Sequence, residues 1–288
     1  MQGQVVVLTG GTSGIGEAAA LKLASLGARL VLVARDPQRA EATLKRLPPG
    51  VKHTAHFADL SRIAETKRVA DEIAAAESRI DVLINNAGIM SARRQLTADG
   101  LELTFATNHL AYFVLTQGLL PNLMASAPAR IINTASEVHR GARLDFNVLQ
   151  SEKSYSSYGA YGKSKLANVL FTRELAKRLD GTGVTVNCLH PGVVASRFAQ
   201  PRNGQGGDPS AASFLASQGI PPEKSAEAIV YLASSPELSQ TTGQYFNQSR
   251  LSKPSAEAQD DATAKKLWVE SERLVGINYE IGRALRTG

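Results

Sequence analysis

Short apolar runs alternate with longer amphipathic stretches along most of the chain. Each run is rich in Val, Ile, Leu or Ala and is bounded by residues such as Gly, Asn, Asp or Ser. Apolar runs without a polar face are typical of strands that are buried on both sides of a parallel sheet. The strands predicted in this way are residues 4–8, 28–34, 51–57, 81–85, 129–134, 184–189 and 243–246.

The amphipathic stretches between these runs predict helices. Asp36 and Pro37 supply an N-cap and a proline at the first helical position, and Ser61 is expected to cap the helix after that. Strands that alternate with helices predict an α/β protein: a doubly wound Rossmann fold with a parallel sheet of about seven strands and helices on both faces. Besides the helix that begins at Asp36, the expected helices are residues 17–26, 61–77, 100–126, 158–180, 223–234 and 256–274.

Length and composition favour one domain. Of the 288 residues 43% are hydrophobic, and no Gly/Ser-rich or Pro-rich linker separates two apolar blocks. We expect residues 1–248 to form the main domain and residues 249–288 a C-terminal helical extension of it. Residues 199–211 are rich in Gly, Pro, Asn and Gln and predict a mobile loop.

Charge and cysteine content argue against several classes of protein. The net charge is +6, but no dense run of Lys and Arg is present, which argues against a nucleic-acid partner. Cys188 is the only cysteine and lies in an apolar strand, which predicts an inert buried thiol in a cytoplasmic protein. No apolar stretch reaches the roughly 18 residues of a membrane span. His53 and His56 lack a cysteine or carboxylate cluster, so no metal site is expected.

A glycine-rich turn follows the first predicted strand. Gly10, Gly14 and Gly16 lie between this strand and the helix that begins at Glu17. Such a strand–turn–helix unit brings backbone N–H groups and a helix N-terminus to an anionic pyrophosphate. Glycines also serve ordinary turns, but the position at the start of a β–α–β unit favours dinucleotide binding.

A tyrosine and a lysine stand four residues apart midway along the chain. On a helix Tyr161 and Lys165 share one face, which holds the ammonium beside the phenol. A neighbouring cation is expected to lower the pKa of the phenol towards the range that is useful for proton transfer. The alternative is an ordinary amphipathic pair on a helix surface. Tyr155 and Tyr158 have glycines four residues on, so only Tyr161 has this lysine.

Two further polar residues complete the candidate chemistry. Ser136 ends the fifth predicted strand, at the edge of the sheet where ligands bind. Asn108 lies inside a predicted helix, where asparagine is unfavourable unless its amide has a role. Each has an ordinary alternative, a loop hydroxyl or cap for Ser136 and a satisfied core amide for Asn108. His139 and His190 flank the expected pocket, either to touch a substrate or to pack.

Together these motifs resemble the short-chain dehydrogenase/reductase family over about residues 4–247. The resemblance implies hydride exchange between a nicotinamide cofactor and an alcohol or carbonyl group. It also implies a catalytic tetrad of Asn108, Ser136, Tyr161 and Lys165, in which Asn108 holds a water of a proton relay. The shared motifs are Thr9-Gly-Gly-Thr-Ser-Gly-Ile-Gly16, Asp59-Leu60, Asn85-Asn-Ala-Gly88, Asn108, Ser136, Tyr161-x-x-x-Lys165 and Pro191-Gly192.

A narrower similarity links the chain to the retinol dehydrogenase and protochlorophyllide reductase branch. It is carried by residues 97–102, 107–110, 161–171 and 190–194. We expect neither the hydrophobic N-terminal anchor of the animal retinol enzymes nor the long insertion of the light-dependent reductases. The branch therefore implies its chemistry but no named substrate.

The second predicted strand bears on the choice of cofactor. NAD-binding units usually place a carboxylate at its end for the ribose 2′-hydroxyl, whereas NADP-binding units use arginine for the 2′-phosphate. Here Ala34 takes the carboxylate's place and Arg35 follows, with Arg39 one turn further on. A guanidinium binds phosphate in bidentate fashion, which favours NADP over NAD. Asp36 is the competing carboxylate, but its expected role is the N-cap.

The resemblance assigns the remaining cofactor contacts. Asp59 is expected to hold the adenine, residues 86–88 to line the adenosine side, and residues 191–196 to hold the nicotinamide amide and the pyrophosphate. Lys165 is also expected to bind the nicotinamide ribose. The full set of expected cofactor residues is Gly10, Thr12, Ser13, Gly14, Ile15, Gly16, Arg35, Arg39, Asp59, Leu60, Asn86, Ala87, Gly88, Tyr161, Lys165, Pro191, Gly192, Val194 and Ser196.

Two segments are expected to enclose the substrate. Residues 139–157 and the substrate loop, about residues 197–220, follow the carboxyl ends of strands, and the loop carries Phe198, Phe214 and Leu215. This composition predicts an apolar carbonyl or alcohol substrate.

Two properties stay open in the sequence. A non-catalytic NADP-binding redox sensor or scaffold is the alternative function, because fold alone does not separate it from an enzyme. A homo-oligomer is the other open point, since some family members pair through the two long helices and others are monomers.

Overall fold

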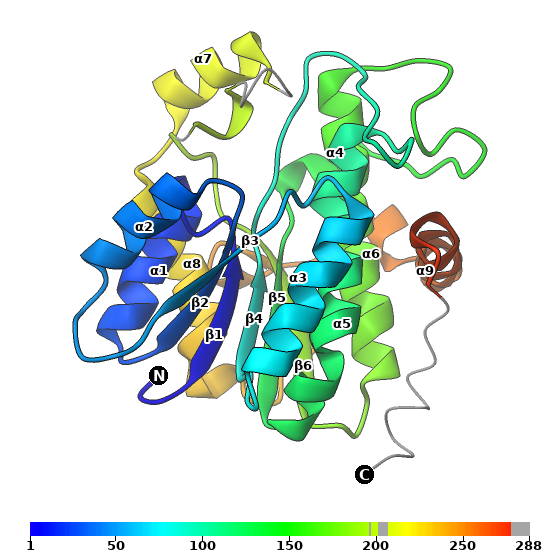
Figure 1. Cartoon of the computed structure of the whole chain (residues 1–288). Coiled ribbons are helices and arrows are strands. Elements are labelled where there is room, and N and C mark those ends of the chain that lie inside the picture. The colour runs from blue at the N-terminus through cyan, green and yellow to red at the C-terminus, as the bar shows by residue number, and fades with distance from the viewer. Residues whose placement is uncertain (196, 201–206, 278–288) are drawn as a thin grey trace.

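One sheet runs through the centre of the computed structural model, which describes residues 1–195, 197–200 and 207–277 (Figure 1). Within these residues the sheet has 8 strands in the order β3-β2-β1-β4-β5-β6-β7-β8, and only the pairing of β7 with β8 is antiparallel. The predicted α/β, doubly wound fold is confirmed. The strands are β1 (Val5–Thr9), β2 (Arg29–Ala34), β3 (Thr54–Phe57), β4 (Val82–Asn85), β5 (Ala129–Thr134), β6 (Val184–His190), β7 (Tyr245–Asn247) and β8 (Arg250–Leu251).

Helices cover both faces of this sheet (Figure 1). The helices α1, α2 and α8 lie on one face, and α3, α5 and α6 lie on the other. Alternate strand residues supply the two cores, since Val5 and Val7 face the second layer while Val6 and Leu8 face the first. The helices are α1 (Gly14–Ser25), α2 (Pro37–Arg46), α3 (Ile63–Ala76), α4 (Leu103–Phe105), α5 (Ala111–Ala125), α6 (Ser157–Arg178), α7 (Pro209–Gln218), α8 (Pro222–Ser234) and α9 (Asp261–Val275).

The strand order reverses at β1, which pairs with β2 on one side and β4 on the other. In doubly wound sheets the ligand crevice opens at such a point, beyond the carboxyl ends of the strands. Thr9 is the last residue of β1, and its hydroxyl accepts hydrogen bonds from the backbone N–H groups of Asn86 and Ala87 at 2.9 and 3.0 Å. The turns after β1 and β4 are therefore held side by side.

Four local predictions need correction. The helix expected at 100–126 is continuous over residues 103–125, but its stretch Ala106–Leu110, which carries Asn108, is a π-helical turn. The loop expected at 199–211 ends earlier than predicted, because its last three residues begin α7, whose N-cap Asp208 accepts from two backbone N–H groups; residues 201–206 lie outside the described residues. Ser61 does not cap α3, because its backbone N–H and its hydroxyl both donate to Asp59. The sheet gains β8, two exposed residues that pair back onto β7.

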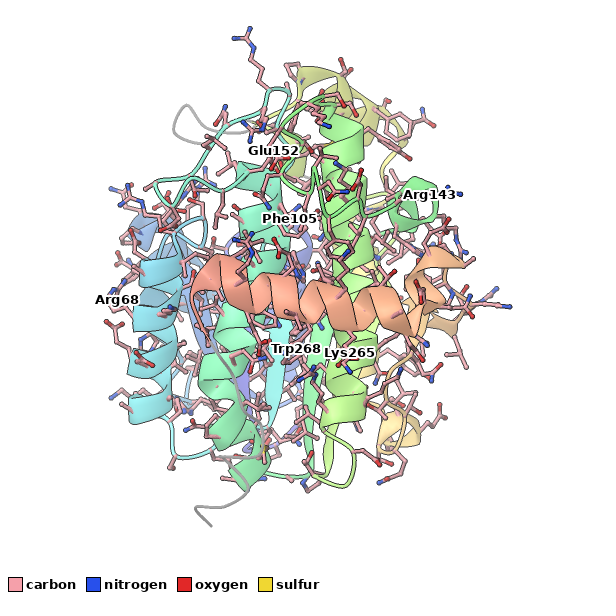
Figure 2. All side chains as sticks on the ribbon, turned by 90° about the vertical axis from the view of Figure 1, so that its right-hand side faces the viewer. Arg68, Phe105, Arg143, Glu152, Lys265 and Trp268 are labelled. Carbon is pink, nitrogen blue, oxygen red and sulfur yellow. The ribbon has the colours of Figure 1, made fainter. Side chains whose placement is uncertain are left out.

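The last described helix, α9, crosses the outer side of α5 and α6 (Figure 2). Its Trp268 is 2% exposed and packs edge-on against Phe113 at 5.0 Å between ring centroids. Arg178 covers the indole, with its guanidinium carbon 4.0 Å from the ring centre. The chain itself thus covers part of the outer surface of α5 and α6, and a homo-oligomer stays a prediction. The domain boundary at residue 248 stays a prediction.

Two further predictions concern the environment of the chain. Cys188 is fully buried, as expected, and burial raises the pKa of its thiol to about 12. The cytoplasmic location stays a prediction. Within the described ranges, no helix combines the length and the apolar character needed to cross a bilayer.

Candidate active site

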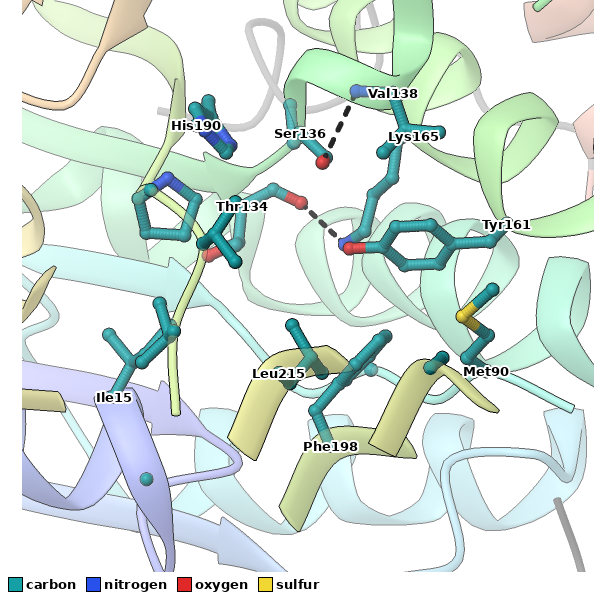
Figure 3. Close-up of a pocket in the computed structure, with 18 of the residues that line it drawn as sticks. Ile15, Met90, Thr134, Ser136, Val138, Tyr161, Lys165, His190, Phe198 and Leu215 are labelled. Atoms are coloured by element: carbon teal, nitrogen blue, oxygen red, sulfur yellow. Dashed lines mark hydrogen bonds between the residues drawn. The ribbon is translucent and has the colours of Figure 1, made fainter. Parts of the chain in front are cut away.

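A cavity of about 1050 Å³ lies at the carboxyl ends of the strands, over the point where the strand order reverses. Its walls come from the glycine turn, from the ends of β4, β5 and β6, from α6 and from the segment that includes α7 (Figure 3). The predicted site residues that line it are Gly10, Ser13, Gly14, Ile15, Gly16, Asn86, Ala87, Gly88, Ser136, Tyr161, Lys165, Pro191, Gly192 and Val194.

The glycine turn forms one end of the cavity and requires its glycines. Gly10 has φ +70, and a Cβ there would lie 2.9 Å from the Cα of Ala87. A Cβ on Gly16 would overlap the carbonyl oxygen of Gly10. Ser13, the N-cap of α1, makes no side-chain cap, so the first N–H groups of this helix stay free to meet an anion. This cradle fits a dinucleotide pyrophosphate.

At the other end of the cavity the structure brings Ser136, Tyr161 and Lys165 together (Figure 3). Lys165 donates from Nζ to the carbonyl oxygen of Thr134 at 2.8 Å. The same Nζ lies 5.5 Å from the centre of the Tyr161 ring. Ser136 takes part in a hydrogen bond with the Tyr161 side chain, which favours the phenolate. Two elements, the end of β5 and helix α6, therefore build this cluster.

Burial dominates the protonation of the pair. It raises the pKa of Tyr161 to about 12, against the smaller opposing effect of Ser136, and lowers the pKa of Lys165 to about 7. The pKa of the phenol is therefore raised, and not lowered towards neutrality as expected, because loss of water disfavours the phenolate more than Ser136 favours it. Tyr161 is thus a protonated phenol at neutral pH, suited to donate a proton.

Asn108 contributes in a different way from the expected one. Its Oδ1 accepts from the N–H of Ile89 at 2.8 Å, and its Nδ2 donates to the carbonyl of Ile89 and to Ser164. The side chain does not line the cavity. These bonds join the π-turn to the loop after β4 and to α6. The alternative reading, in which the Asn108 side chain is a satisfied core amide, therefore agrees with the structure. The role of Asn108 in a proton relay stays a prediction.

Five expected cofactor residues lie outside the cavity wall: Thr12, Arg35, Arg39, Asp59 and Leu60. Arg35 and Arg39 are exposed, the first after the end of β2 and the second on α2. Asp36 caps α2, as expected, by accepting from the N–H groups of Gln38 and Arg39. Ser196 lies outside the described residues.

Apolar side chains form the wall opposite the polar cluster. Phe198 packs against Tyr161 with 5.1 Å between ring centroids, and Leu215 and Met90 lie near it (Figure 3). Phe214 and Leu215 project from α7, a helix with no buried residue. Three side chains of the predicted loop, Phe198, Phe214 and Leu215, thus line the cavity, and their role as a lid over the substrate stays a prediction. The predicted roof over 139–157 is wrong except for Ser156 and Ser157, which alone of that stretch reach the cavity.

The sequence did not decide whether His139 and His190 contact a substrate or only pack in the core. His190 lines the cavity, and its Nδ1 has no hydrogen-bond partner. Burial lowers the pKa of His190 to about 4, so a neutral imidazole faces the cavity. His139 is fully buried beneath the loop of Ser136 and does not line the cavity. A single sequence carried no signal to separate the two, since both follow strand ends.

The comparison with known proteins decides the family. The family model described as short chain dehydrogenase matches residues 4–206. This chain belongs to the short-chain dehydrogenase family. It falls in the retinol dehydrogenase-like branch, since it is 40% identical to human retinol dehydrogenase 13, over 96% of this chain and 85% of that protein. Human retinol dehydrogenase 12 is 38% identical, over 97% of this chain and 89% of that protein.

Solved structures agree with the assignment to short-chain dehydrogenases. An uncharacterized protein from Mycobacterium paratuberculosis has 30% identity and a TM-score of 0.75, with 97% of this chain and 96% of that chain covered. A short chain dehydrogenase from Burkholderia cenocepacia, solved in complex with NADP, has 26% identity and a TM-score of 0.68, with 90% and 99% covered. As a short-chain dehydrogenase the protein is an enzyme that acts on an alcohol or carbonyl group.

Proposed function

We propose that this short-chain dehydrogenase uses NADP(H) to interconvert a carbonyl and an alcohol on an apolar small molecule, with Tyr161 as the general acid and base. One observation carries the proposal. The cavity that begins at the glycine cradle ends at Ser136, Tyr161 and Lys165, and Met90, Phe198, Phe214 and Leu215 give one side of its wall an apolar surface. Cofactor phosphates and a reacting oxygen thus have places in one continuous space.

Three side chains, those of Ser136, Tyr161 and Lys165, take part in the proposed reaction at the substrate oxygen. A bound nicotinamide cofactor supplies or accepts the hydride. The Ser136 hydroxyl donates to the carbonyl oxygen as negative charge develops there. The Tyr161 phenol gives that oxygen its proton, and its raised pKa keeps the proton available at neutral pH. Lys165, held by Thr134, adds positive charge beside the phenol and stabilises the phenolate that remains.

Arg35 supports the choice of NADP. Its guanidinium is exposed at the end of β2, where no free carboxylate competes, because Asp36 is engaged in capping α2. A 2′-phosphate would meet Arg35 and, one turn on, Arg39, which also pairs with Asp36 at 3.4 Å. The NADP complex of the Burkholderia cenocepacia enzyme agrees with this choice.

The relatives and the cavity wall together support an apolar substrate. Two similar proteins bear the name retinol dehydrogenase, which denotes a long hydrophobic alcohol. Phe198, Phe214, Leu215 and Met90 supply matching apolar surface here. An apolar ligand would bury its surface against these four side chains, whereas a phosphate group would lose part of its hydration there.

The test is NADPH consumption, followed by absorbance, with a panel of carbonyls: retinal, a medium-chain aldehyde, an aromatic ketone and a sugar phosphate. We expect turnover with the apolar compounds and none with the sugar phosphate. NADH at the same concentration is expected to give lower kcat/KM. Tight NADPH binding without turnover of any compound would instead favour the sensor or scaffold.

A further inference from the structure

The C-terminal segment, residues 252–275, follows the part of the chain matched by the family model, which ends at residue 206. It packs across α5 and α6 on the side away from the sheet (Figure 2). Two of its serines, Ser271 and Ser255, nevertheless make buried hydrogen bonds to histidines that adjoin the catalytic cluster. These two connections are the basis of the inference.

The first connection runs from α9 to the lysine. Ser271 Oγ lies 3.0 Å from Nε2 of His109, and Nδ1 of His109 lies 3.2 Å from Oδ1 of Asn168. Asn168 then donates from Nδ2 to the carbonyls of Asn108 at 2.9 Å and Thr134 at 3.2 Å. The carbonyl of Thr134 is also the acceptor for the Lys165 ammonium. One amide therefore fixes the oxygen that holds the lysine.

The donor and the acceptor can be assigned for each hydrogen bond in the series that runs from Ser271 to Lys165. Carbonyl oxygens only accept, so the atom of Asn168 that faces two of them is its NH₂ group, and its oxygen faces His109. His109 must then carry its proton on Nδ1 and accept from the Ser271 hydroxyl at Nε2. His109 is fully buried, and burial lowers its pKa to about 4, so it stays neutral. This series of hydrogen bonds therefore keeps the same donors and acceptors at neutral pH.

The second connection runs from Ser255 to the serine loop. The backbone N–H of Ser255 donates to Nε2 of His139 at 3.2 Å, so Nδ1 of His139 carries the proton. That proton goes to the carbonyl of Ser136, 2.6 Å away. The His139 ring also packs on Tyr245, with 4.8 Å between ring centroids. The backbone of Ser136 is thus held from the same C-terminal segment.

We propose that residues 252–275 position the catalytic cluster through two positioning residues: His109, which acts on Lys165 by way of Asn168, and His139, which acts on Ser136. The C-terminal segment is then part of the active-site machinery, besides a cover for α5 and α6. The effect on turnover rests on the proposed function, whereas the effect on Lys165 does not.

Three variants test the proposal in the full chain. Ser271→Ala removes the outer end of the first connection, Asn168→Leu removes its amide without adding charge, and His139→Phe keeps the ring but removes both hydrogen bonds. We expect kcat to fall about tenfold for Ser271→Ala and His139→Phe, and about a hundredfold for Asn168→Leu, since a misplacement near 1 Å costs roughly that much. The KM for NADPH should change much less than kcat, because the glycine cradle that is expected to hold the pyrophosphate stays intact.

Trp268→Phe is the matched control on α9. It removes buried packing and the bond from Nε1 to Glu272, but it touches neither histidine. It should lower Tm at least as much as Ser271→Ala while keeping kcat within about twofold. An equal loss of kcat in Trp268→Phe, at matched loss of Tm, would show that α9 acts only through general stability and would overturn the proposal.

A second readout needs no substrate. The pKa of Lys165 is measured through its 13Cε resonance, with Lys165→Arg for assignment. Ser271→Ala should lower this pKa by about half a unit, because the Thr134 carbonyl loses its fixed position, and Trp268→Phe should leave it unchanged. No shift in Ser271→Ala, with kcat within twofold of wild type, overturns the first connection. If the wild type turns over no carbonyl, the proposed function fails, and this titration still decides whether α9 positions Lys165.

Discussion

The Lys165 ammonium lies 5.5 Å from the centre of the Tyr161 ring, and burial shifts the two groups in opposite directions. The pKa of the lysine falls from 10.5 to about 7, while that of the phenol rises to about 12. Both shifts have one cause, since each charged form loses its water. The site therefore contains the Tyr161 phenol, which stays protonated, and the Lys165 ammonium, whose charged form is destabilised by burial.

Lys165→Met should therefore stabilise the protein and inactivate it. Below pH 7 the folded chain carries a buried charge that the unfolded chain carries in water, so Lys165 lowers stability there. Between pH 7 and 10.5 the unfolded chain binds the extra proton, and the stability of the wild type rises with pH relative to the variant. We expect a Tm about 5 °C above wild type at pH 6, a gain that shrinks towards pH 10. A gain independent of pH, measured by calorimetry, would contradict this assignment of the lysine pKa.

Tyr161→Phe should abolish turnover. The change removes the proton donor while keeping the ring that packs on Phe198, so kcat should fall by at least about 10²-fold, and the affinity for NADPH should change less than about threefold. Tyr158→Phe is the control, since Tyr158 lies on the same helix, is 63% exposed and has no lysine four residues on. Activity of Tyr161→Phe within tenfold of wild type removes the phenol from its proposed role.

Arg35→Ala should weaken NADPH more than NADH. A charge-assisted hydrogen bond to phosphate contributes about 1.5–3 kcal/mol, which is roughly ten- to a hundredfold in Kd. Only NADPH carries the 2′-phosphate, so the Kd for NADH should barely move. Fluorescence titration with both cofactors measures the difference. Arg46→Ala, at the far end of α2, is the control, because Arg46 pairs with Glu17. Equal losses for both cofactors would assign Arg35 another role.

Phe198→Ala should impair long apolar substrates selectively. The ring borders Tyr161 and the apolar wall, so its removal should raise KM for a long-chain aldehyde about tenfold, in keeping with roughly 1.5–3 kcal/mol for a buried aromatic side chain. A three-carbon aldehyde has little apolar surface to bury against the ring, so its KM should change by less than about twofold. Steady-state kinetics with an aldehyde series tests this. A KM effect that does not depend on chain length argues against an apolar wall at Phe198.

Local features of the fold were predictable because backbone geometry fixes their period. Apolar runs gave seven of the strands, and the spacing of four residues placed Tyr161 and Lys165 on one face of α6. The glycines of the first turn were equally legible, since only they tolerate the close approach of Gly10 and Gly16. Even the missed helix α7 had a signal. Asp208-Pro209 repeats the cap and proline of Asp36-Pro37.

The sequence by itself thus determined the fold class, the family motifs and which residues lie at the strand ends. Only the tertiary structure decided the protonation states and the hydrogen-bond partners of these residues. The pKa of Lys165 depends on how completely distant segments exclude water. One of the hydrogen bonds of Asn108 goes to Ser164 on α6, which is 56 residues away in the sequence. Likewise Ser271 meets His109 across 162 residues. A period of two or four residues fixes which side chains share a face, but desolvation and long-range hydrogen bonds arise only when those faces meet.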